Sequence, residues 1–191
     1  FDRVHLTLME NIETVNLKSI AGEIDMQVRH HTMARVPLYK KHEAQSNYWT
    51  HHAPGIAPTD GTINLNRSYE VDAVLGKLLL ERDFRIALSL GADREEINEL
   101  FFLGLGQPRA FSPDPGTLYW PGKDFHFKYS ERDLTKANAL LDGLGLTERD
   151  ADGFRLRSDG KTLTLHFVLL EGYETDWLPM AEMLGKHWKK I

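Results

Sequence analysis

The sequence contains no cysteine among its 191 residues. This absence excludes disulfide bonds, thiolate metal sites and cysteine nucleophiles. No apolar run approaches the ~18 residues that a membrane-spanning helix needs, and no signal peptide is recognisable from Phe1 onward. Glycine and proline together make up only 23 of the 191 residues, whereas apolar residues make up 41%. This composition excludes a disordered chain and is typical of a globular protein with one good core.

The sequence also lacks an excess of basic residues. Lysine and arginine total 23, aspartate and glutamate total 28, and the formal net charge is −5. Basic and acidic residues alternate along most of the chain, so the sequence argues against binding to a nucleic-acid backbone. The most basic stretch, residues 186–190, is best interpreted as the solvated last turn of a helix.

Hydrophobic periodicity predicts strands and helices in irregular alternation. Strand patterns occur at residues 4–8, 24–28, 48–52, 63–66 and 163–170. Helical patterns occur at residues 11–21, 33–44, 71–80, 84–90, 93–104, 130–143 and 177–191. The predicted fold class is therefore α/β or α+β, with a mixed β-sheet flanked by helices.

Helix ends carry recognisable signals. Gly22 follows the first helical pattern, where a C-cap belongs. Asp93 precedes another, and Glu96 stands three residues later, which predicts a capping box in which Glu96 reaches back to Asp93. Pro37 is expected in a first helical turn or at a break.

Motifs for catalysis, metal binding and cofactor binding are missing. The sequence has no G-x-S-x-G, no Walker loop and no dinucleotide glycine fingerprint. Two pairs of adjacent histidines occur, at 30–31 and 51–52. Adjacent side chains on a strand point to opposite faces, so neither pair can place both rings on one metal ion. The Asp150 loop has Lys161 where a calcium loop needs its last carboxylate. We therefore expect no catalytic residue, no metal and no cofactor.

Three regions offer candidate ligand-binding residues. The loop at 107–129 is long and aromatic, and Tyr119 with Trp120 either faces a ligand or packs the loop onto the domain. Glu171 and Tyr173 follow the strongest strand pattern, where they form either a polar site or an ordinary turn. The third region is a short strand on which two amides share one side, facing either solvent or a polar cleft: Asn64 and Asn66.

Five segments, taken in order, resemble one protein family. Residues 17–25 (LKSIAGEID) are similar to its S-G-E-I-D passage, and residues 83–97 resemble its V-R-Q-A-L-S-x-A-I-D-R-x-x-I helix pair. Residues 104–108 (GLGQP) are similar to its G-x-G-x-P exit, residues 129–141 resemble Y-D-P-E-K-A-K-A-L-L, and residues 150–160 resemble D-x-D-G … D-G-K. The family is the bacterial extracellular solute-binding proteins of family 5, the substrate-binding components of ABC importers.

The resemblance implies more than the residues alone do. It implies one lobe of a two-lobed periplasmic-binding-protein fold, with residues 1–191 as part of the C-terminal lobe, truncated at both ends. It implies capture of a small solute, such as a peptide or an oligosaccharide, and partnership with an ABC transporter membrane permease. It also implies a periplasmic or extracellular location, with membrane anchoring in a longer protein. The strand with Asn64 and Asn66 falls near the family's inter-lobe hinge, which favours the cleft, whereas Arg85 and Arg94 are expected to be structural.

A second class of function stays open at this point. A hydrolase could use an Asp/Glu pair, which needs the two carboxylates within about 5–10 Å of each other. The binding-protein interpretation predicts no enzymatic activity, weak ligand binding by these residues alone, and an exposed apolar face that promotes dimerisation.

Overall fold

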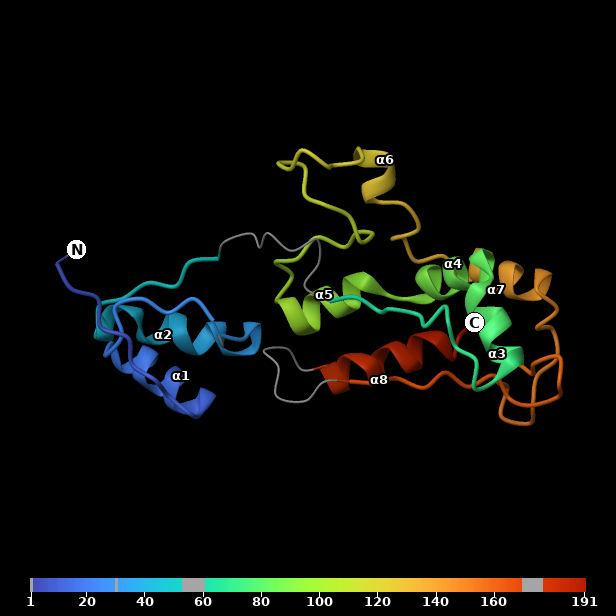
Figure 1. Ribbon diagram of the computed structural model, residues 1–191, viewed down its shortest axis with the longest axis horizontal. Coiled ribbons are helices and arrows are strands. Elements are labelled where there is room, and N and C mark those ends of the chain that lie inside the picture. The colour runs from blue at the N-terminus through green and yellow to red at the C-terminus, as the bar shows by residue number, and fades with distance from the viewer. Residues whose placement is uncertain (1, 30, 53–60, 170–176) are drawn as a thin grey trace. The chain divides into compact units, whose positions relative to one another are not determined.

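The computed structural model describes residues 2–29, 31–52, 61–169 and 177–191 (Figure 1). Of these, residues 2–29 and 31–52 fall in one compact unit, and residues 61–169 and 177–191 form a second.

The first unit is built on two helices, α1 (Ile12–Ala21) and α2 (Val36–Ser46), with the short helix η1 (Met33–Arg35) leading into α2. Asn11 caps α1 by accepting the backbone N–H of Glu13 at 2.7 Å. Gly22 ends it at φ 74°, a left-handed conformation that glycine adopts without a steric penalty. The predicted C-cap is thus confirmed, and Pro37 stands in the first turn of α2 as expected.

The two helices of this unit share a buried polar contact. The Tyr39 hydroxyl on α2 donates to Asn16 Oδ1 on α1 at 2.6 Å, and both residues are buried. Burial raises the pKa of the Tyr39 hydroxyl, which keeps it in the neutral, donating form.

The second unit contains most of the described helices. They are α3 (Ala73–Leu80), α4 (Arg82–Gly91), α5 (Arg94–Phe102), α6 (Lys123–His126), α7 (Leu134–Gly143) and α8 (Trp177–Trp188). Helix α4 packs along α7, and it also contacts α3 and α8. All the helices predicted from periodicity are present, with ends shifted by a few residues.

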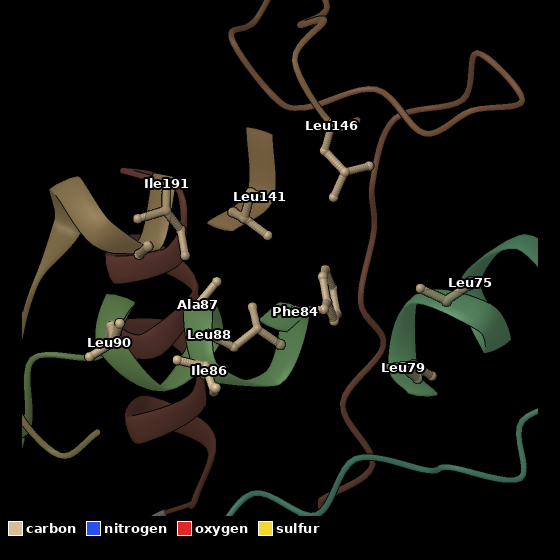
Figure 2. Packing of buried hydrophobic residues seen from close by; sticks show 11 residues of the cluster. Leu75, Leu79, Phe84, Ile86, Ala87, Leu88, Leu90, Leu141, Leu146 and Ile191 are labelled. Atoms are coloured by element: carbon tan, nitrogen blue, oxygen red, sulfur yellow. The ribbon is translucent and has the colours of Figure 1, made fainter. Parts of the chain in front are cut away.

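The core of the second unit gathers around α4. Figure 2 shows Phe84, Ala87 and Leu88 of α4 at the centre of this cluster. Leu75 and Leu79 of α3 lie on one side of them, and Leu141 of α7 and Ile191 lie on the other. Phe84 and Leu90 are completely buried, and Leu141 of α7 is 2% exposed. Each such side chain contributes about 1.5–3 kcal/mol when it is removed from water, so this cluster is the main source of stability in the unit.

Helix α5 begins as predicted but is capped differently from a capping box. Asp93 Oδ1 accepts the backbone N–H of Glu96 at 3.1 Å, which confirms the N-cap. The prediction that Glu96 accepts the backbone N–H of Asp93 is wrong, because this N–H donates instead to Nδ1 of His187 at 3.2 Å. With Nδ1 as acceptor, the ring carries its proton on Nε2 and donates to Glu96 at 2.8 Å. A residue of α8, distant in sequence, therefore completes the start of α5.

The two arginines expected to be structural are confirmed in that role. Arg85 donates to the carbonyl oxygens of Leu79 and Leu80 at the end of α3. Arg94 donates to the carbonyl oxygen of Ser89 at 2.8 Å and to its hydroxyl at 2.8 Å. Burial lowers the pKa of the Arg94 guanidinium.

A third arginine joins distant turns of this unit. Arg157 is 7% exposed and forms ion pairs with Asp72 at 2.7 Å and with Asp159 at 2.5 Å. Asp72 also caps α3 by accepting the backbone N–H groups of Val74 and Leu75, each at 3.0 Å. The turn at 157–160 is thereby fastened to the start of α3.

The predicted mixed sheet is not present in the described residues. Only two isolated antiparallel bridges occur there, Arg149 with Arg155 and Leu156 with Thr162. The described parts of all five predicted strand segments have no ladder of paired strands. A strand is stable only beside another strand whose backbone groups pair with its own, and these segments do not find such neighbours in the described part of the chain. Alternating burial is observed at 163–166, where Leu163 and Leu165 are partly buried, but not at 4–8, where every side chain is exposed, and the predicted pairing is absent.

Two further findings concern the described residues as a set. No helix among them is long and apolar enough to cross a membrane. Within the same ranges, no group of three or more histidine, aspartate or glutamate side chains is arranged to hold a metal ion.

Candidate ligand-binding surface

The aromatic loop at 107–129 is held at its start by a side-chain clamp. Asn98 of α5 accepts the backbone N–H of Gly106 at 2.8 Å and donates to its carbonyl oxygen at 3.1 Å. A Cβ atom at position 106 would lie 2.7 Å from Asn98 Oδ1, so a larger residue would break the clamp. The second glycine of the G-x-G motif before the loop, Gly106, is thus needed because only glycine leaves room for the Asn98 side chain.

Inside the loop, His126 forms the centre of a buried polar network. Its ring is 1% exposed and lies 2.7 Å from the Ser112 hydroxyl through Nδ1 and 3.2 Å from Arg109 through Nε2. Arg109 also forms an ion pair with Asp114 at 2.6 Å. This network fixes the loop from within, although the loop has few regular elements.

The same network argues against a Ser/His catalytic pair. An arginine can only donate, so Nε2 of His126 accepts from Arg109 and the neutral ring carries its proton on Nδ1. Nδ1 then donates to the Ser112 oxygen, whereas a general base would have to accept the serine proton. Both side chains are also buried, at 1% exposure each, which keeps them from a substrate. Their role is structural.

The two candidate aromatics of the loop have different surroundings. Trp120 is 37% exposed and meets the His126 ring edge-on, with 6.3 Å between the ring centroids. This contact lies within the loop, so the packing of Trp120 onto the domain and its contact with a ligand both stay predictions. Tyr119 is 80% exposed, so its ring and hydroxyl present an amphipathic surface to the surroundings.

The two candidate amides lie on the solvent side of their segment. Asn64 and Asn66 are exposed, whereas Leu65 between them is partly buried against the core. Asn66 Oδ1 accepts the backbone N–H of Ser68 at 3.0 Å, which forms a local turn. The predicted same-side arrangement agrees with this burial pattern. No hydrogen bond or ring contact among the described residues joins either amide to Tyr119 or Trp120. Glu171 and Tyr173 lie outside the described residues.

A separate apolar cavity of about 360 Å³ lies elsewhere in the second unit. Its walls include Phe84 and Trp188 from the helices and Leu165 and Phe167 from the segment that runs past them. The four described candidate residues, Asn64, Asn66, Tyr119 and Trp120, do not line it. Polar solutes need convergent hydrogen-bonding groups, but the arginine with the deepest burial there, Arg155, already donates to carbonyl oxygens of Leu146 and Ile191. The cavity is therefore a poor candidate for a polar solute.

Sequence reasoning missed the residues that hold the loop. Ser112 and His126 belong to no recognisable motif, because each is a single polar residue next to aromatic residues. The only available signal was that a long aromatic loop cannot stay ordered without internal bonds. That signal predicts a network without indicating its members.

Comparison with known proteins decides the family. The profile described as "Bacterial extracellular solute-binding proteins, family 5 Middle" matches residues 1–191. The chain belongs to this family. The resemblance seen in five sequence segments is therefore confirmed over the whole chain.

A solved structure supports the family 5 fold. This family 5 chain is similar to the "oligopeptide-binding protein OppA", with 33% sequence identity and a TM-score of 0.73. The match covers 95% of the present chain and 29% of the OppA chain, so the chain spans less than a third of the length of that relative. No curated protein matches. The periplasmic-binding-protein fold is thus shown, while the mixed sheet within it is not.

Proposed function

We propose that this family 5 chain is part of the substrate-binding component of an ABC-type importer that captures peptides outside the cytoplasmic membrane. The observation that carries the proposal is the match of the whole chain to the solute-binding family, together with its likeness to a protein named for oligopeptide binding. The solute proposed is a peptide because the solved relative is named for that ligand. The proposed partner in transport is the membrane permease of the importer.

The proposed contribution of these residues is one part of a larger binding protein. Coverage of 29% of the solved relative supports this proposal. The unpaired strand segments support it as well, since Leu6, Leu8 and Val168 are 88%, 93% and 95% exposed. Large apolar side chains at such exposure are typical of segments that pack against further structure. We propose that residues 1–191 belong to the C-terminal lobe of that protein.

Within the described residues, we propose that Tyr119 contacts the peptide, with Trp120, Asn64 and Asn66 as further members of the surface. A largely exposed aromatic ring on an internally fastened loop offers a large contact area at little cost in conformational entropy. Amides at 64 and 66 supply donors and acceptors for a peptide backbone. Glu171 and Tyr173 are proposed to complete this surface.

Binding rather than catalysis is supported by two observations. The family profile and the solved relative are both described as binding proteins. The buried Ser112 and His126 pair has its proton on the wrong nitrogen for nucleophilic catalysis. The hydrolase alternative has no comparable support.

The proposal is tested by titrating the chain with a mixture of tripeptides to pentapeptides and following Tyr119 and Trp120 by NMR. We expect saturable shifts with a dissociation constant weaker than about 1 μM, because one part of a two-lobed cleft supplies only some of the contacts. Tyr119→Ala should weaken binding severalfold. Phe111→Ala is the matched control, since Phe111 is a 61% exposed aromatic of the same loop and is not a proposed site residue. Equal effects of the two substitutions would refute the site.

A further inference from the structure

Three cationic side chains of the second unit converge on the ring of Tyr129. The Arg82 guanidinium carbon lies 5.8 Å from the ring centroid, and the Nζ atoms of Lys128 and Lys136 lie 5.5 Å and 5.7 Å from it. These distances are within the range of cation–π attraction. The four residues are called the Tyr129 cluster below.

The cluster is assembled from separate parts of the chain. Arg82 begins α4, Lys136 lies in the first turn of α7, and Lys128 and Tyr129 lie between α6 and α7. Helices α4 and α7 pack side by side (Figure 1), which brings the three cations together.

Tyr129 is fixed at the centre of the cluster. Its hydroxyl accepts from Arg82 at 2.8 Å, and its carbonyl oxygen accepts from the Ser89 hydroxyl at 2.8 Å. Its φ is 58°, a conformation that non-glycine residues adopt only when the surroundings hold them there. The ring also packs against the core. The cations are thus grouped around a rigid base.

The three cations have no acidic partner among the ion pairs of the described residues. Glu81 and Asp83 flank Arg82 along the chain, yet neither pairs with it in that set. Asp133 Oδ1 is used to cap α7, where it accepts the backbone N–H of Lys136 at 2.8 Å. Three uncompensated positive charges in a chain with a formal charge of −5 form a local site of attraction for anions.

We infer that the Tyr129 cluster docks a carboxylate-rich segment of a partner protein. Charge complementarity of this kind steers a partner toward one patch and fixes its orientation. The net negative charge of the chain disfavours unspecific binding of an acidic partner. The inference does not depend on the identity of the transported solute.

Two other anionic partners fit the cluster less well. Bidentate arginine is the strongest single contact to a phosphate or a carboxylate alike, and Nη2 of the one arginine in the cluster is occupied by the Tyr129 hydroxyl. The three cations therefore act as separate positive charges around one ring, which suits several carboxylates along a segment better than one small anion. Polybasic membrane-binding sites usually contain 4–8 basic residues, whereas only three converge here.

The test uses a hexaglutamate peptide as the probe. The isotope-labelled chain is titrated with the peptide at about 50 mM and about 300 mM NaCl, between which exposed charge interactions become strongly screened. We expect saturable amide shifts centred on residues 82, 128 and 136 at low salt, and binding at least several times weaker at high salt. Absence of localised shifts at low salt would overturn the inference.

Charge-reversal variants supply the control. Lys128→Glu/Lys136→Glu should weaken peptide binding by about tenfold or more, and Lys128→Gln/Lys136→Gln should weaken it less. Lys186→Glu/Lys190→Glu changes the net charge equally at two exposed lysines outside the cluster and should leave binding nearly unchanged. The four substituted positions, 128, 136, 186 and 190, are all exposed, so the melting temperatures should stay close to that of the parent chain. An equal loss in the cluster and control variants would refute the inference.

Two further probes separate the alternatives. Inorganic phosphate that shifts the same amides as strongly as the peptide would overturn the inference in favour of a simple anion site. Binding to phosphatidylglycerol vesicles that is lost in Lys128→Glu/Lys136→Glu would overturn it in favour of a membrane surface. Failure of phosphate and vesicles to compete with the peptide supports the protein partner.

Discussion

The cap of α5 allows the account of the fold to be tested in detail through Asp93. One carboxylate oxygen of Asp93 accepts the backbone N–H of Glu96, and the other pairs with Arg132. Asp93→Ala removes both interactions. Loss of an N-cap costs about 0.5–2 kcal/mol, and a partly exposed ion pair contributes about 0.2–1 kcal/mol. The Arg132 and Asp93 side chains are 33% and 16% exposed, which supports a value inside that second range.

The two contributions are separable. Asp93→Asn keeps an acceptor for the Glu96 N–H but loses the charge that pairs with Arg132. We expect Asp93→Ala to lower the free energy of unfolding by about 1–3 kcal/mol and Asp93→Asn by about 0.2–1 kcal/mol. For a unit of this size, 1 kcal/mol corresponds to a change of about 2–8 °C in melting temperature.

The assay is urea and thermal unfolding followed by circular dichroism at 222 nm. Because the chain has two units, the transition of the second unit is fitted separately. Glu95→Ala, at an exposed position in the same helical turn, is the control and should change stability by less than about 0.5 kcal/mol. If Asp93→Asn were as destabilising as Asp93→Ala, the ion pair and not the cap would stabilise α5, and the reasoning would be wrong.

Three further predictions concern the core, the acid limit and self-association. Leu90→Ala, at a fully buried position, should cost about 2–5 kcal/mol in urea unfolding, whereas Leu100→Ala, at a 60% exposed position, should cost little; similar losses would contradict the described core. The backbone N–H of Leu75 and the Arg157 guanidinium lower the pKa of Asp72, and the same guanidinium lowers the pKa of Asp159. A lowered carboxyl pKa stabilises the fold above its unfolded value near pH ~4 and ceases to do so as the pH falls through the folded value. The free energy of unfolding of the second unit should therefore fall below about pH 4, and Arg157→Gln should make that fall shallower. An unchanged fall would contradict the ion pairs of Arg157 with Asp72 and Asp159. The exposed apolar residues also predict self-association of the isolated chain, which sedimentation velocity would detect as a dimer and which a monomer at high concentration would disprove.

The helices were predictable because their signals are local. Helix α1 begins after its N-cap Asn11 and ends at its C-cap Gly22, and α5 begins after its N-cap Asp93. The capping hydrogen bonds of these residues span only a few positions. Period and cap together therefore located the helices to within a few residues.

The sheet and the loop network were not predictable because they depend on distant partners. Alternation at 163–169 correctly indicates one apolar side, but it does not say which strand pairs with it. His187 reaches Asp93 from a position 94 residues away, and no local pattern indicates that contact. Of the candidate site, the exposure of Asn64, Asn66 and Tyr119 agrees with the sequence analysis, while the packing of Trp120 on His126 required the structure.

The most direct test of solute binding is saturation-transfer NMR on the chain with a mixture of short peptides and malto-oligosaccharides. This measurement detects weak binding and also shows whether the peptides stay intact. The account predicts saturation transfer to peptides, little transfer to the sugars, and no shortening of the peptides after prolonged incubation. Cleaved peptides, or transfer to the sugars but not to the peptides, would contradict it.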